Sequence, residues 1–74
     1  MIWSFERSGQ RLSCEIRRDE DGQYYEFVVS GPDGTERTER YEEPSEVVTR
    51  SVDVMRGLIE EGWHSLPVKA ASIG

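Results

Sequence analysis

The chain has little of what metal, redox or membrane functions need. A single cysteine, Cys14, cannot form an internal disulfide, and one thiol with one histidine, His64, falls short of any zinc ligand set. We therefore expect no metal and no cofactor, and no pattern points to a small-molecule ligand. No apolar run approaches the roughly 18 residues of a membrane helix, and the first residues lack the pattern of a signal peptide. These absences predict a cytoplasmic protein with no membrane partner.

Positive charge is also scarce. Nine Lys and Arg residues stand against 15 Asp and Glu residues, which gives a formal net charge of −6. This charge opposes the counterion release that drives binding to nucleic-acid phosphates, and it equally disfavours anionic membrane surfaces. A protein partner of neutral or basic character is the better expectation.

The apolar residues that are present fall in short patterned clusters, which indicates a folded chain although only 35% of it is hydrophobic. Seventy-four residues make one domain, close to the lower size at which a single core outweighs the entropy of folding. We expect the domain to span residues 1–66. Residues 67–74 show no periodicity, and we expect them to form a flexible C-terminal tail.

Period-two alternation and turn signals predict an antiparallel meander of four strands. The strands are expected at residues 2–7, 11–18, 23–30 and 35–41. The turns between them are expected at Ser8-Gly9, Asp21-Gly22 and the segment from Gly31 to Gly34. The fourth strand, TERTER followed by Tyr41, has the weakest pattern, and its charges are typical of an edge strand protected against aggregation.

The turns fix a register that two independent patterns support. Apolar side chains pair on one face: Phe5 with Leu12, Trp3 with Cys14, Cys14 with Val29, Ile16 with Phe27, and Tyr25 with Tyr41. On the other face Arg17, Glu26 and Arg40 form one row of alternating charge. Because a shift of one residue would break both patterns, the register is strongly specified.

A helix is expected from Pro44 to about Glu61, since proline suits the first helical position and acidic residues precede it. Its apolar residues lie in one arc of about 160°, which we expect to pack on the sheet. They are Val47, Val48, Val52, Val54, Met55, Leu58 and Ile59. Gly62 suits the left-handed position after the helix, and Trp63 is then expected to cover the helix end beside Leu58. The predicted fold is α+β, a β-β-β-β-α chain with one C-terminal amphipathic helix packed on one sheet face.

The side chains that could perform chemistry all have simpler explanations. His64 has no partner residue set by any motif, and Cys14 lies in the middle of the apolar face. The pairs Glu42-Glu43 and Glu60-Glu61 lie at helix ends, where solvated carboxylates are common. We therefore expect no catalytic, cofactor-binding or metal-ligating residue, and no enzyme.

The function expected from the sequence is a small acidic interaction module that binds another protein or forms a homodimer. The first strand supplies the candidate interface, Ile2, Trp3, Ser4 and Phe5. In a four-stranded meander this strand lies at an edge and carries no charge over these residues, and unprotected edges usually have a partner.

Two alternatives remain. The order of four strands and a helix is similar in topology to the single-stranded DNA-binding coactivator and whirly-type folds, although their motifs and basic surface are missing. Single-stranded nucleic-acid binding through the sheet would require a patch built from Arg7, Arg11, Arg17, Arg18, Arg37 and Arg40. An acidic inhibitor or antitoxin-like protein would require clustered carboxylates that imitate phosphates.

Overall fold

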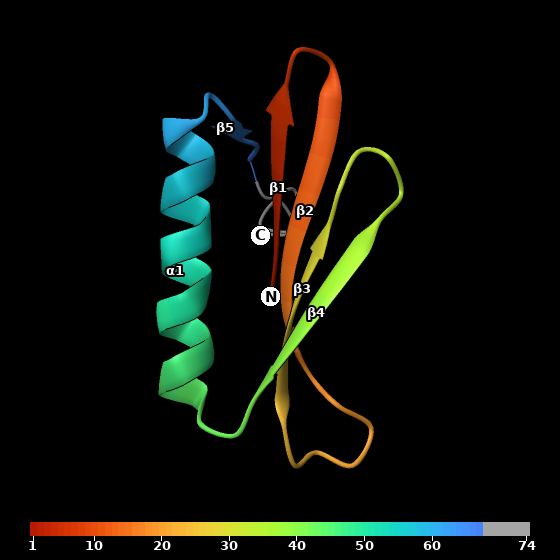
Figure 1. The fold of residues 1–74 in the computed structure, drawn as a ribbon, viewed down its shortest axis with the longest axis vertical. Helices are drawn as coiled ribbons and strands as arrows, with labels where there is room; N and C mark the ends of the chain where they lie inside the picture. The colour runs from red at the N-terminus through yellow and green to blue at the C-terminus, as the bar shows by residue number, and fades with distance from the viewer. Residues whose placement is uncertain (68–74) are drawn as a thin grey trace, which may run out of the picture.

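The computed structural model describes residues 1–67 and confirms the predicted fold class. Its elements are β1 (Ile2–Arg7), β2 (Gln10–Arg18), β3 (Tyr25–Ser30), β4 (Glu36–Tyr41), α1 (Pro44–Glu60) and β5 (His64–Ser65). The strands form one antiparallel sheet of order β4-β3-β2-β1-β5, and α1 packs on one face of it (Figure 1). The weakest of the predicted strands, β4, is present.

The first hairpin has the predicted two-residue loop. Ser8 and Gly9 have φ angles of 51° and 80°, and two such left-handed residues match the twist of the flanking strands. Arg7 consequently lies opposite Gln10, and Phe5 lies opposite Leu12. The predicted register of β1 and β2 is confirmed.

The second hairpin has a longer loop than the predicted Asp21-Gly22 turn, and β3 begins at Tyr25 instead of residue 23. The cause is Asp19, whose carboxylate accepts hydrogen bonds from the backbone N–H groups of Gln23 (3.0 Å) and Tyr24 (3.3 Å). Such side-chain bonds compete with strand pairing. The register beyond the loop is still the predicted one, with Arg18 opposite Tyr25.

The third hairpin closes as predicted, and it brings β4 into register with β3. The N–H of Gly34 donates to the carbonyl of Gly31 (3.1 Å), and the N–H of Gly31 donates to the carbonyl of Thr35 (2.8 Å). Pairing then continues to Tyr25 opposite Tyr41.

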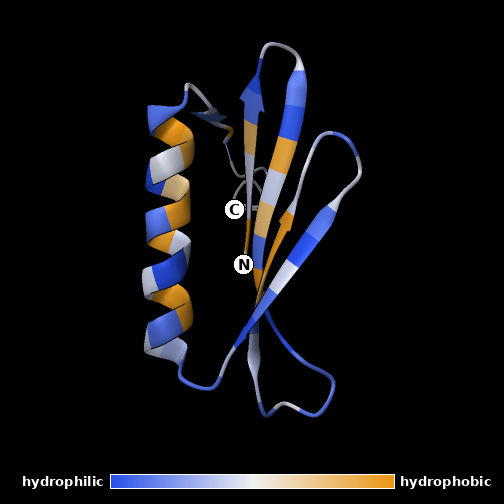
Figure 2. Ribbon diagram, viewed as in Figure 1, coloured by the Kyte–Doolittle hydropathy of each residue, from blue (hydrophilic) through white to orange (hydrophobic). Residues whose placement is uncertain are grey.

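The core lies between the sheet and α1. Its most buried apolar residues come from four elements and the segment after the helix, each with 5% exposure or less: Phe5, Cys14, Phe27, Val47 and Trp63. Figure 2 shows apolar residues recurring along the whole of α1 and along the strands beside it. One helix face and one sheet face therefore share a single core, as predicted.

The helix ends in the predicted left-handed motif. Gly62 has a φ of 98°, and the N–H groups of Gly62 and Trp63 donate to the carbonyls of Ile59 and Leu58, both at 3.0 Å. Trp63 is 5% exposed. The Arg7 guanidinium lies 4.6 Å from the ring centroid and donates a hydrogen bond to the Glu61 carbonyl. Sequence reasoning did not identify this arginine, which covers the outer side of the ring.

The short strand β5 corrects the expectation that β1 is an open edge. His64 and Ser65 pair with Glu6 and Phe5, and the N–H of Leu66 donates to the carbonyl of Ser4 at 2.9 Å. The chain thus returns from the helix end to the outer side of β1. Residues 68–74, which hold most of the predicted tail, lie outside the described residues.

Within residues 1–67, no helix is both long enough and apolar enough to cross a membrane.

Replacing Trp63 with alanine should lower the free energy of unfolding by about 2 to 4 kcal/mol, because it removes a buried ring from the core and from the helix end. Trp63→Phe keeps an aromatic ring there and should lose less. Urea denaturation of both variants and the wild type measures the effect. An unchanged midpoint for Trp63→Ala would show that the ring does not hold the helix end.

Candidate protein interface

Three apolar residues of α1 that were expected to pack on the sheet lie on the surface instead. Val48, Val52 and Ile59 are 48%, 44% and 59% exposed. The prediction that all seven apolar helix residues face the sheet is therefore wrong for these three. The predicted core contacts are made by the other four, of which Val47 is the most buried at 1% exposure.

The residues of α1 that face the sheet and those left exposed form two parallel lines along the helix. The inner line, Val47, Ser51, Val54 and Leu58, is turned toward the core. The outer line, Val48, Val52, Met55 and Ile59, is displaced by one residue, or about 100° around the axis. We refer to these four residues as the outer seam. The sheet covers the inner line and leaves most of the outer seam exposed.

Ser51 takes a position facing the sheet that the hydropathy pattern assigned to apolar residues. Its side chain is 2% exposed, although serine was not expected in the core. The hydroxyl donates a hydrogen bond to the Val48 carbonyl at 2.8 Å, so it is buried without losing its partner. Hydropathy alone offers no signal that a serine takes the central position while Val48 stays outside.

An ion pair joins the other flank of the helix to β4. The Nε and Nη2 atoms of Arg50 donate to the Glu39 carboxylate of β4 at 2.9 and 3.2 Å. This contact, together with a hydrogen bond from Tyr41, holds the pKa of Glu39 below its usual value. Arg50 and the outer seam lie on different flanks of α1, so the seam is turned away from β4.

The four residues of the interface predicted on β1 do not form one surface. Phe5 is a core residue with 2% exposure, and the Ser4 carbonyl is bound by Leu66. Trp3 is partly buried against the core, which leaves Ile2, at 59% exposure, as the exposed apolar side chain of the four. A contact through Ile2 and Trp3 stays a prediction.

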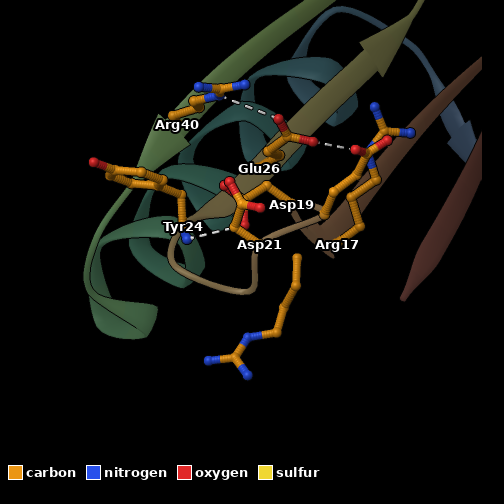
Figure 3. A pocket seen from close by; sticks show the side chains of 8 residues that line it. Arg17, Asp19, Asp21, Tyr24, Glu26 and Arg40 are labelled. Atoms are coloured by element: carbon orange, nitrogen blue, oxygen red, sulfur yellow. Dashed lines mark hydrogen bonds and ion pairs between the residues drawn. The ribbon is translucent and has the colours of Figure 1, made fainter.

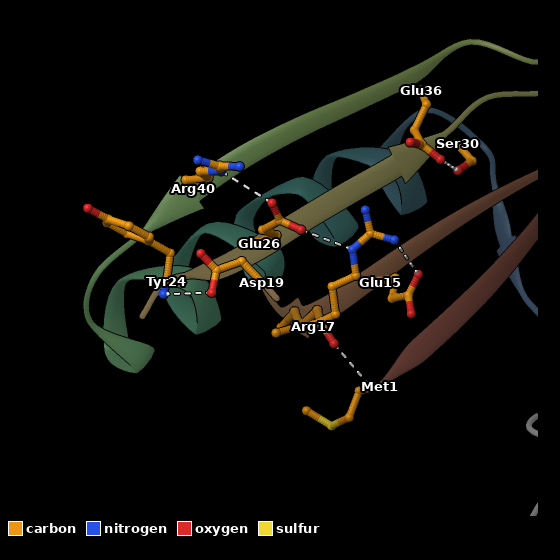
Figure 4. Close-up of polar contacts among 10 residues, drawn as sticks. Met1, Glu15, Arg17, Asp19, Tyr24, Glu26, Ser30, Glu36 and Arg40 are labelled. Atoms are coloured by element: carbon orange, nitrogen blue, oxygen red, sulfur yellow. Dashed lines mark hydrogen bonds and ion pairs between the residues drawn. The ribbon is translucent and has the colours of Figure 1, made fainter. Parts of the chain in front are cut away.

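The sheet face opposite the helix carries the predicted row of charges (Figure 4). Both oxygens of Glu26 accept hydrogen bonds, from Nε of Arg17 at 3.1 Å and from Nε of Arg40 at 3.2 Å. The Glu26 side chain is only 11% exposed. The hydrogen bond that Arg17 donates to Glu26 raises the pKa of Arg17 above its usual value. These contacts engage two of the arginines that a nucleic-acid surface would require.

A hollow of about 600 Å³ lies beside this row (Figure 3). Its lining includes three arginines and four carboxylates, which together give a charge of −1: Arg17, Arg18, Arg40, Asp19, Glu20, Asp21 and Glu26. Glu26 is already bound by two of the arginines, and Asp19 is bound by the loop backbone. This balance does not favour a phosphate or another anion.

The two side chains most associated with chemistry lie apart from each other. Cys14 is 0% exposed, and burial raises the pKa of its thiol to about 11. His64 is exposed and lies opposite Glu6 in the short β1–β5 pairing. Among residues 1–67, no group of three or more His, Cys, Asp or Glu side chains is placed to hold a metal ion.

Comparison with protein-family models, with curated proteins and with solved structures found no match to the chain.

The Cys14 thiol should react with iodoacetamide at pH 8 at least about 100-fold more slowly in the folded protein than in guanidinium, because it is buried and protonated. Mass spectrometry of quenched samples measures both rates. Alkylation of the folded protein at the rate of the unfolded chain would contradict the core position of Cys14.

Proposed function

We propose that this protein is a non-enzymatic interaction module that binds another protein chain through the outer seam of α1. The observation that carries the proposal is the exposure of Val48, Val52 and Ile59 at 48%, 44% and 59%. Single exposed apolar residues are normal on a protein surface, but a regular line of them indicates an interaction site.

The spacing of the outer seam favours a helical partner. Its residues, Val48, Val52, Met55 and Ile59, follow one another at intervals of four, three and four. This is the repeat at which helices pack knobs into holes, and it places all four side chains on one line of the helix. No charged residue interrupts the seam, so a partner would bury apolar surface without stranding a charge.

The use of the reactive side chains within the fold supports a non-enzymatic role. Glu26 and Glu39 are bound by arginines, and Cys14 is enclosed in the core. A reduced, buried thiol also fits a reducing compartment, which supports a cytoplasmic location.

Photo-crosslinking tests the proposal directly. A photoreactive amino acid at position 52 should give a discrete adduct with a protein chain in cells that naturally produce this protein, because the seam would be covered by its partner. The same group at Asp53, an exposed position on another side of the helix, should give far less adduct. Equal yields at both positions, or none, would refute the proposal.

Single-stranded nucleic-acid binding is the competing function, and the paired arginines of the sheet face weigh against it. We predict no measurable binding of single-stranded DNA at physiological salt, as followed by fluorescence anisotropy with a labelled oligonucleotide. Sub-micromolar affinity that weakens steeply with added salt would contradict this and favour the competing function.

A further inference from the structure

Resting on the proposed function, we infer that the partner of the outer seam is a second copy of this chain, packed helix against helix in antiparallel orientation. The contact is made by the outer seam, whose residues all lie on one flank of α1 and three of which are exposed: Val48, Val52, Met55 and Ile59.

The seam is complementary to itself. Its intervals of four, three and four residues are the same when read from either end. A two-fold axis between Val52 and Met55 therefore places Val52 opposite Met55 of the second copy, and Val48 opposite Ile59. Each copy then contributes the same surface, as a closed two-fold dimer requires. All layers of this contact are apolar.

Helix electrostatics favour the antiparallel orientation. A parallel pair would place the two positive N-terminal ends side by side, and likewise the two negative C-terminal ends. The last turn of α1 holds no basic residue, and Arg7 of β1 donates one hydrogen bond to the Glu61 carbonyl at this end. In an antiparallel pair, the backbone N–H groups of the other helix's first turn lie beside the remaining carbonyls of the last turn.

The size of the seam sets the expected affinity. Four side chains per copy make a contact smaller than a standard interface, so we expect dissociation on the order of 10 μM or weaker. Each copy also carries a charge of −6, which opposes association. Added salt should therefore strengthen the dimer, whereas counterion release would weaken a nucleic-acid complex.

Sedimentation velocity from about 5 to 300 μM tests the inference. The wild type should shift from monomer to dimer, and Val52→Lys should weaken the dimer at least tenfold. Asp53→Lys is the matched control, because it adds the same side chain at the next position but away from the seam. It also lowers the net negative charge more than Val52→Lys does, so it should dimerise at least as well as the wild type.

Disulfide trapping tests the orientation. In an antiparallel pair, Val48→Cys and Ile59→Cys proteins should form a mixed disulfide dimer when combined under mild oxidation, and each alone should form little. Parallel packing would give the reverse. The wild type, whose Cys14 is buried, is the control and should form none.

Two outcomes would overturn the inference. One is a wild type that stays monomeric at 300 μM, and the other is a dimer that Val52→Lys leaves intact. If the photo-crosslinked adduct at position 52 contains a different protein, the proposed function holds and the second copy is excluded as the partner.

Discussion

The register between β2 and β3 is the constraint on which the rest of this structure depends. It places Ile16 opposite Phe27 on the helix side and Arg17 opposite Glu26 on the other side. A slip of one residue would expose Phe27 and turn Glu26 into the core, at the cost of an unpaired buried charge. The strands β1 and β4 extend this pair on either side, and α1 packs on the face that the pair defines.

Sequence reasoning succeeded where the physical cause was local. Ser8-Gly9 and Gly62 each set the chain direction within a few residues, so the first hairpin and the end of α1 could be predicted. The extended second loop could not, because it depends on which backbone groups the Asp19 carboxylate binds. The strand β5 has only two residues, too few for any periodicity, and it forms because the turn at Gly62 returns the chain to β1.

The candidate interface shows a second limit of prediction from the sequence. Hydropathy gives the width of the apolar arc of a helix but not its rotation on the sheet. That rotation follows from tertiary contacts, since the Arg50–Glu39 pair joins one flank of α1 to β4 and Trp63 packs in the core after the last turn. These contacts bury Ser51 and leave Val48 outside, against the order that hydropathy alone would give.

The residues of the outer seam lower the stability of α1, and the isolated domain does not recover this loss. Val48, Val52 and Ile59 are β-branched residues, which are weaker helix formers than the alanine, glutamate or lysine that exposed helix positions usually favour. In the isolated domain they lose side-chain freedom in the helix while remaining 44% to 59% exposed. Burial of the same side chains against a second helix would recover about 0.8 kcal/mol for each methylene-sized group removed from water. The placement of these residues is thus unfavourable for the monomer alone and favourable once a helix packs against the seam.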